Sequence, residues 1–207
     1  ITLDKVRRFA YIKIVSDEEF MNILYVHGFG SQYDPTQDKI QMLETIGTVS
    51  GITIDYCKGF DVVLQLITDA VQSQKIDLII GTSMGGYMAA HVGSRVGIPF
   101  VSLNPAIAPS TTLQRWIGNF TDYAGNDRCL TETGVASYPN FPETGCGLVI
   151  VESSDEVISA SLTRQTLDQV FHVETFAGGS HRFTHIERAL PLIQAHYQNA
   201  QNNYGLE

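Results

Sequence analysis

A serine flanked by glycines is the residue of this sequence best suited to covalent chemistry. The segment Gly81-Thr82-Ser83-Met84-Gly85 fits the pattern GxSxG and follows an apolar run that begins at Asp77. Glycines on both sides let a strand turn sharply into a helix, which leaves the serine hydroxyl exposed at the turn. We therefore predict that Ser83 is a nucleophile. The alternative is a glycine-rich turn that only allows close packing or that binds a phosphate, although the phosphate-binding patterns GxGxxG and GxxxxGKS/T are absent from the sequence.

A serine hydroxyl needs a base, usually an imidazole oriented by a carboxylate. Of the six histidines, His181 stands in the segment AGGSH, directly after the apolar run Phe171 to Phe176. In α/β enzymes with a serine nucleophile after a strand, the base follows the last strand of the sheet. The acid is expected after the preceding strand, and Asp155 follows the run Gly147 to Glu152. The order Ser83, Asp155, His181 puts each side chain just past the carboxyl end of a predicted strand.

Other assignments compete with this one. Asp155 could instead cap a helix that begins near Val157, with Glu152 and Glu156 as alternative acids. The pair His181 and His185 has the i, i+4 spacing of a zinc helix, but the sequence has no HExxH and no cysteine nearby, so we predict no metal site. Packing in strands and helices is the simpler interpretation of the remaining candidate histidines, which are His91, His172, His185 and His196.

Acyl transfer also requires hydrogen-bond donors for the developing oxyanion. The backbone N–H of Met84, the residue after the nucleophile, is one such donor by construction. The segment His27-Gly28-Phe29-Gly30 follows an early strand, so the N–H of Phe29 is the predicted second donor. This assignment leaves His27 to shape the loop rather than to act as a base.

Short runs of branched residues alternate with longer helical patterns, which predicts an α/β fold with a mostly parallel sheet and helices on both faces. The predicted strands are Asn22 to Val26, Ile52 to Asp55, Asp77 to Gly81, Phe100 to Leu103, Gly147 to Glu152 and Phe171 to Phe176. The predicted helices are Pro35 to Ile46, Phe60 to Gln74, Met84 to Val96, Ile158 to Val170 and His185 to Gln198. The sheet is therefore the element that brings the three predicted side chains together.

The segment from Pro105 to Cys146 departs from this alternation, because prolines and glycines interrupt it. We interpret these residues, 105–146, as a cap segment inserted at the edge of the sheet, with a short helix around Leu113 to Ile117. Its apolar and aromatic side chains are candidates for substrate contact, with ordinary packing as the equal alternative: Ile107, Leu113 and Trp116. No other domain is expected in residues 21–207, and residues 1–20 are interpreted as an N-terminal extension in which Tyr11 to Val15 could form a strand.

Charge and composition exclude several classes of protein. The 13 basic against 22 acidic side chains give a net charge of −9, which argues against nucleic acid as a partner. No apolar run approaches the roughly 20 residues of a membrane span, and no signal peptide is recognisable. The three cysteines are widely spaced and odd in number, which favours reduced thiols and a cytoplasmic location: Cys57, Cys129 and Cys146.

With these residues placed, the sequence resembles the small YqiA-like esterases of bacteria, an α/β-hydrolase family. The resemblance is carried by NILYVHGFGS, GTSMGGYMAAHV, SLNPAIAPS, SSDEV and AGGSHRFTHIE, in this order. It implies an α/β-hydrolase fold with Ser83 as nucleophile, Asp155 as acid and His181 as base. It also implies an esterase that acts on small-molecule acyl esters, and it admits acyl-CoA-type thioesters as a substrate class. The predicted triad mechanism requires no cofactor.

Two other functions remain compatible with the sequence. An acyltransferase would form the same acyl-enzyme and pass the acyl group to an acceptor other than water. A binding protein on a hydrolase scaffold would keep the fold without turnover, because fold alone does not guarantee activity. The presence of all three triad members and both oxyanion positions favours an enzyme over the binding protein.

Overall fold

A computed structural model describes residues 20–204 of the chain. The predicted strand at Tyr11 to Val15 and nearly all of the proposed extension 1–20 lie outside the described residues. Six strands form one parallel sheet in the order β2-β1-β3-β4-β7-β8. These strands are β1 (Met21–Val26), β2 (Gly47–Gly51), β3 (Leu78–Thr82), β4 (Phe100–Leu103), β7 (Gly147–Glu152) and β8 (His172–Phe176).

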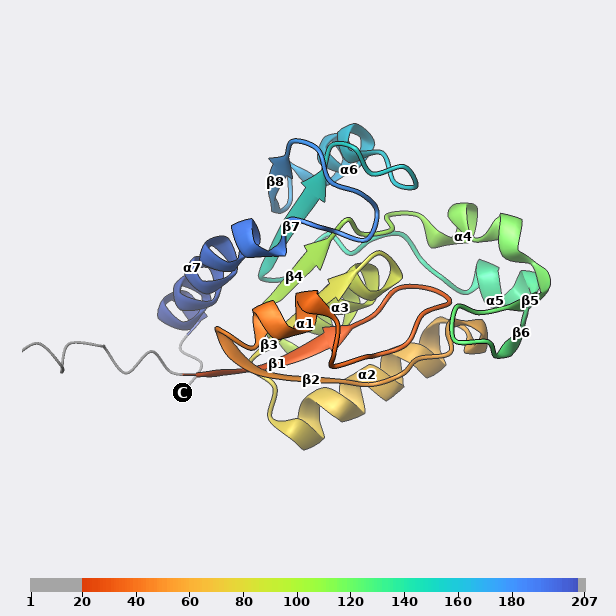
Figure 1. The fold of residues 1–207 in the computed structure, drawn as a ribbon, viewed down its shortest axis with the longest axis horizontal. Coiled ribbons are helices and arrows are strands. Elements are labelled where there is room, and N and C mark those ends of the chain that lie inside the picture. Colours follow the sequence, from red (N-terminus) through yellow and green to blue (C-terminus); the bar gives the residue numbers. More distant parts are fainter. Residues whose placement is uncertain (1–19, 205–207) are drawn as a thin grey trace, which may run out of the picture.

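Helices cover both faces of this sheet (Figure 1). The helices α1 (Asp38–Leu43) and α7 (Ile186–Tyr204) pack on one face, and α2 (Phe60–Gln74), α3 (Met84–Val96) and α6 (Ala160–Leu167) pack on the other. Successive strand side chains point to opposite faces, so in β3 Ile79 joins the core under α2 and α3 whereas Ile80 joins the core under α1 and α7. The predicted parallel α/β arrangement is therefore confirmed, because strands buried on both faces read as continuous apolar runs.

The prediction of a second strand at Ile52 to Asp55 is wrong, since β2 spans Gly47–Gly51. Among residues 20–204 this strand lies at the edge of the sheet and pairs with β1 alone, beginning with Met21 opposite Gly47. A Cβ at Gly47 would lie 2.4 Å from the Met21 carbonyl oxygen, so the pairing requires glycine. The sequence GTVSG has no apolar run that would indicate a strand, whereas the branched residues that follow it do not pair in the sheet.

The cap segment also departs from the prediction. It connects β4 with β7, which are neighbours inside the sheet, so it does not lie at the sheet's edge. In Figure 1 its elements lie at the end of the sheet toward which β1 points. The short helix predicted around Leu113 to Ile117 is present as the 3-10 helix η2 (Gln114–Trp116). The cap segment also contains elements that the sequence did not predict: α4 (Pro109–Thr112), an antiparallel hairpin of β5 (Gly118–Thr121) and β6 (Asp127–Leu130), and α5 (Glu132–Ala136).

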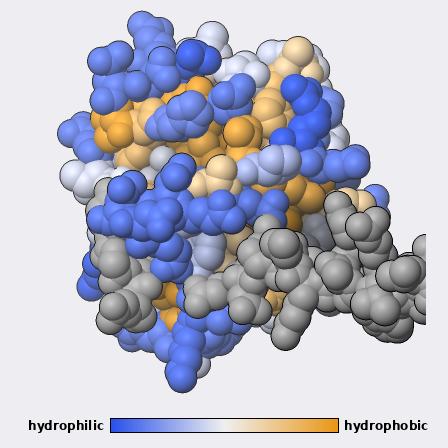
Figure 2. Space-filling model, turned by 90° about the vertical axis from the view of Figure 1, so that its left-hand side faces the viewer, coloured by the Kyte–Doolittle hydropathy of each residue, from blue (hydrophilic) through white to orange (hydrophobic). Residues whose placement is uncertain are grey.

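The remaining helix predictions are confirmed in place but not always in length. The helices α2 and α3 match their predicted bounds, while α1 and α6 are shorter than predicted and α7 continues to Tyr204 although Pro191 lies inside it. Within residues 20–204 we find no helix with the length and apolar character that a membrane crossing requires. Figure 2, a view from the side of α7, shows a surface of mostly hydrophilic side chains with smaller apolar areas between them.

Candidate active site

Ser83 occupies the sharp turn between β3 and α3. Its backbone has φ 58° and ψ −122°, a conformation that residues other than glycine rarely adopt. The turn depends on glycine, because a Cβ at Gly85 would lie 1.9 Å from the Val26 carbonyl oxygen and one at Gly81 would lie 2.2 Å from Gly85. The glycines thus let the first turn of α3 approach β1 and β3 closely, which fixes the serine at the carboxyl end of β3.

Ser83, His181 and Asp155 form a chain of hydrogen bonds. His181 Nε2 lies 2.9 Å from Ser83 Oγ, and His181 Nδ1 lies 2.9 Å from Asp155 Oδ2 and 3.0 Å from Oδ1. A carboxylate only accepts hydrogen bonds, so Nδ1 carries the proton and Nε2 of the neutral ring accepts from the serine hydroxyl. The structure brings together the three side chains that the sequence selected from segments as much as 98 residues apart.

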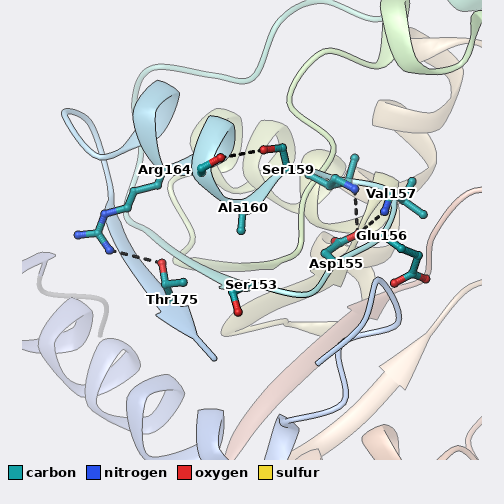
Figure 3. Close-up of a pocket in the computed structure, with 10 residues that line it drawn as sticks. Ser153, Asp155, Glu156, Val157, Ser159, Ala160, Arg164 and Thr175 are labelled. Carbon is teal, nitrogen blue, oxygen red and sulfur yellow. Dashed lines mark hydrogen bonds between the residues drawn. The ribbon is translucent and has the colours of Figure 1, made fainter. Parts of the chain in front are cut away.

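The Asp155 carboxylate is held by its own loop. Its Oδ1 accepts hydrogen bonds from the backbone N–H groups of Val157 and Ile158, both at 2.8 Å (Figure 3). The helix α6 begins later, at Ala160, and Ser159 caps it by accepting from the N–H of Leu162. The alternative that Asp155 is the cap of this helix is therefore wrong. With its side chain only 1% exposed, the carboxylate faces His181 in a fixed orientation.

The loop after β1 lies directly beside the serine. A Cβ at Gly28 would be 3.3 Å from the Ser83 Cβ and 3.8 Å from its Oγ, which places the backbone of the next residue, Phe29, near the nucleophile. Met84 is the first residue of the 13-residue helix α3, whose amino end favours negative charge. Both predicted oxyanion donors, the N–H groups of Phe29 and Met84, thus belong to segments that border Ser83.

His27 shapes this loop, as predicted from the sequence. Its Nε2 accepts a hydrogen bond from the Ile54 N–H at 2.8 Å, and its Nδ1–H donates to the Gly28 carbonyl at 2.8 Å. Burial lowers the pKa of His27, which keeps the ring neutral and both hydrogen bonds intact. In addition, the Tyr56 hydroxyl donates to the His27 carbonyl at 2.5 Å. Both ring nitrogens are engaged in structure, so neither is available as a base.

The cap segment supplies an aromatic cluster next to the same loop. The ring of Phe29 stacks on Phe120 at 5.4 Å between centroids and lies 5.8 Å from the ring of Trp116. Ile107 is half-buried against the core that lies under α2 and α3. Leu113, in contrast, is 4% exposed within the core under α2 and α3, so packing accounts for its position.

Lys39 is a residue near the site that the sequence did not indicate. Its ammonium group donates to Thr82 Oγ1 at 3.1 Å and to the carbonyl of Arg182, the neighbours in sequence of Ser83 and His181. From its position in α1, Lys39 therefore links the turn at Ser83 to the loop of residues 177–185 that carries His181, called the histidine loop below. A lysine beside an apolar helix position has no local feature that would reveal this contact.

The Asp155 loop also lines a groove of about 670 Å³ (Figure 3). It runs along the start of α6 toward Arg164 and Thr175, and Asp155 lines it whereas Ser83 and His181 do not. Among residues 20–204, no group of three metal-binding side chains comes together.

Comparisons with known proteins agree with this architecture. The UPF0227 protein YcfP of Escherichia coli O9:H4 (strain HS) is 28% identical over 189 residues, covering 84% of this chain and 97% of YcfP. Est1E from Butyrivibrio proteoclasticus superimposes with a TM-score of 0.65 at 16% identity, covering 91% of each chain. Mouse alpha/beta hydrolase domain-containing protein 10 has a TM-score of 0.62 at 14% identity, covering 88% of this chain and 90% of that protein.

At such identities the solved structures show the fold, which is that of the α/β hydrolases, as predicted. The predicted resemblance to YqiA-like proteins is confirmed at the level of the family, with YcfP among the relatives. The model of the uncharacterised protein family UPF0227 matches residues 22–198, so the chain belongs to the UPF0227 family.

Proposed function

We propose that this protein is a serine esterase that hydrolyses acyl esters of small molecules through an acyl-enzyme. The observation that carries the proposal is the chain of hydrogen bonds from Ser83 through His181 to Asp155, with both distances at the imidazole ring equal to 2.9 Å. These are the distances at which a base can take a proton from a nucleophile and a carboxylate can orient that base.

In the proposed reaction, His181 Nε2 removes the hydroxyl proton while Ser83 Oγ attacks the ester carbonyl carbon. The carbonyl oxygen gains negative charge, which the N–H groups of Phe29 and Met84 stabilise. The imidazolium then gives the proton to the departing alcohol, and the acyl group stays on Ser83. Water, deprotonated by His181, then attacks the acyl carbon. The imidazolium returns this proton to Ser83 Oγ as the acid leaves, so the enzyme regains its first state. The buried Asp155 keeps the ring in the required tautomer and stabilises its positive charge.

The surroundings of Ser83 bear on the substrate. The aromatic cluster of Phe29, Trp116 and Phe120 borders the proposed oxyanion site and offers an apolar surface to the acyl or alcohol group. Acyl-CoA-type thioesters fall within the proposed class, because their carbonyl carbon reacts through the same steps. All three cysteines are unpaired, which supports the proposed cytoplasmic location: Cys57, Cys129 and Cys146.

Labelling with a fluorophosphonate tests the proposal, with mass spectrometry to locate the adduct. We expect a phosphonate on Ser83 alone, because among the serines of residues 20–204 only this one has a hydrogen bond to an imidazole that is itself oriented by a carboxylate. Ser83→Ala should remove the label and lower ester turnover by about 10⁴-fold or more with the fold intact. The matched control is Ser73→Ala, on the exposed side of α2, which should keep the label and the turnover.

Two results would contradict the proposal. Failure of folded wild-type protein to take up the label or turn over any ester would favour a binding protein on a hydrolase scaffold. Product analysis in the presence of alcohol and amine acceptors separates hydrolysis from acyl transfer, and predominant transfer at low acceptor concentration would identify an acyltransferase instead.

A further inference from the structure

The carboxylate of Glu152 contacts the loop that carries His181 at several backbone positions, whereas Glu156 accepts a single hydrogen bond from that loop, from the N–H of His181 at 3.0 Å. The backbone N–H of Ser180 donates to Glu152 Oε2 at 2.7 Å, that of Thr184 to Oε1 at 3.0 Å, and that of His185 to Oε1 at 2.7 Å. These donors lie on both sides of His181. Glu152 therefore binds the loop before and after His181. These positions lie beyond the end of β8, so strand pairing does not hold them.

Glu152 is fully buried, with 0% of its side chain exposed. Burial of a carboxylate is strongly unfavourable unless hydrogen bonds or an opposite charge compensate. Compensation comes from the three backbone donors and from His185, whose Nδ1 lies 2.8 Å from Oε1. A loop that moved away would leave this charge unpaired in the interior, so the carboxylate ties the loop to one position.

The close approach of the loop is visible at Gly179. A Cβ on this residue would lie 2.1 Å from the Glu152 carboxylate, and its backbone has φ +82°, which favours glycine. The glycine lets the chain pass against the carboxylate so that the N–H of the next residue, Ser180, can point at it.

Asn104 continues the network from the neighbouring strand. This residue is 1% exposed and has φ +44°, and its side chain makes contacts with two other segments. Its Oδ1 accepts from the backbone N–H of Glu152 at 2.8 Å, and its Nδ2 donates to the Ser180 carbonyl at 2.9 Å. Asn104 thus joins the end of β4, the end of β7 and the histidine loop.

The same strand end therefore serves His181 in two ways. Asp155, three residues after Glu152, orients the ring, whereas Glu152 sets where the backbone of the loop lies. The hydrogen bonds of the ring to Ser83 and Asp155 require both the ring orientation and the loop position to be correct. A misplacement of about 1 Å at a catalytic group can cost about 100-fold in rate.

We infer that Glu152, supported by Asn104 and His185, is the positioning residue that sets the location of the base. The inference rests on the proposed function. Glu152 is not itself a catalytic residue, since its carboxylate is bound to the loop and touches neither Ser83 nor the His181 ring.

The variant Glu152→Gln tests this role, because it keeps the size of the side chain and replaces one acceptor with an amide group that cannot accept from an N–H. We expect kcat for an activated ester to fall about 100-fold, KM to stay within twofold, and the rate of phosphonate labelling at Ser83 to fall in parallel with kcat. The matched control is Glu174→Gln on the adjacent strand β8, where the carboxylate is 40% exposed and pairs with His172. This control should keep wild-type kcat, KM and labelling.

A proton spectrum separates this inference from the proposed function. The Nδ1 proton of His181, bound to Asp155, should give a downfield resonance that is absent from Asp155→Asn. We expect Glu152→Gln to weaken or shift this resonance and Glu174→Gln to preserve it. If the wild type neither labels nor hydrolyses esters, the proposed function fails, but the resonance still reports whether Glu152 positions the ring.

Glu152→Gln with kcat, labelling rate and resonance all unchanged would overturn the inference. If this variant does not fold, His185→Gln provides the test, because the side chain of His185 is 32% exposed and tolerates substitution more readily. We then expect kcat to fall about tenfold at constant KM and the His181 resonance to shift. Wild-type kcat together with an unshifted resonance in His185→Gln would equally overturn the inference.

Discussion

Two carboxylate–imidazole pairs lie close together in this protein, and they differ in the other groups that each pair contacts. Asp155 binds Nδ1 of His181, and the other nitrogen of that ring contacts Ser83. Glu152 binds Nδ1 of His185, and this carboxylate also binds the backbone of the loop. The first pair has the geometry that the proposed proton transfer requires, whereas the second pair binds the backbone of the loop.

At the scale of single residues, this difference predicts unequal effects of removing the two rings. His181→Ala should lower kcat/KM for an activated ester by about 10⁴-fold, because it removes the base. His185→Ala should cost about tenfold, because Glu152 keeps its backbone donors. Steady-state kinetics of both variants checks the prediction. A larger loss from His185→Ala than from His181→Ala would identify His185, and not His181, as the base.

At the scale of elements, the hairpin of β5 and β6 is linked to the segment that shapes the proposed oxyanion site. Arg128 in β6 binds Asp122 at 2.8 Å and Asp55 at 3.0 Å, and Asp55 precedes the 3-10 turn η1 (Tyr56–Lys58). The Tyr123 N–H donates to the Gly30 carbonyl at 2.8 Å, directly after Phe29. The hairpin thus restrains the Phe29 loop from outside.

Arg128→Met should loosen this attachment while keeping most of the apolar volume of the side chain. We expect kcat/KM to fall about tenfold, since the Phe29 N–H is held less firmly, and limited proteolysis to cut the hairpin faster. The matched control is Arg164→Met, which breaks an exposed pair with Asp168 at 3.6 Å and should change neither quantity. Wild-type kinetics and wild-type proteolysis of Arg128→Met would show that the hairpin does not restrain the loop.

At the scale of the whole molecule, buried imidazoles make folding sensitive to acid. Burial lowers the pKa of His27 and His196, and it lowers that of His91 to about 4. His91 packs between the rings of Phe60 and Tyr87, and its Nε2 is buried without a hydrogen-bond partner in the described structure. A proton on His91 is therefore costly in the folded protein.

The free energy of unfolding should consequently fall as the pH drops below about 6.5, where the unfolded chain takes up protons that the folded protein does not. From pKa values of 6.5 unfolded and about 4 folded, His91 alone should account for about 2 kcal/mol at pH 5. Urea unfolding at pH 7.5 and pH 5 measures the loss. His91→Phe should reduce it, whereas His172→Gln, at a ring that is 68% exposed, should not. An equal loss in His91→Phe and wild type would exclude His91 as its source.

The sequence by itself determined five of the six strands of the sheet, the nucleophile turn and the order of the three proposed catalytic residues. These features depend on local patterns, such as apolar runs for strands buried on both faces and glycines around Ser83 for the sharp turn after β3. Asp155 and His181 could be selected because each stands a few residues after a predicted strand, at the same edge of a parallel sheet. The catalytic roles themselves stay predictions until the variants are measured.

Only the tertiary structure decided what holds these residues in place. The contacts of Glu152 with Ser180 and His185 join residues 28 and 33 positions apart, and its contact with Asn104 spans 48. The edge strand β2 and the hairpin of the cap segment likewise take their positions from partners distant in the chain. A buried charge finds its donors only when the chain has folded, so neither periodicity nor a motif in the sequence can show which carboxylate orients the imidazole of His181 and which anchors its loop.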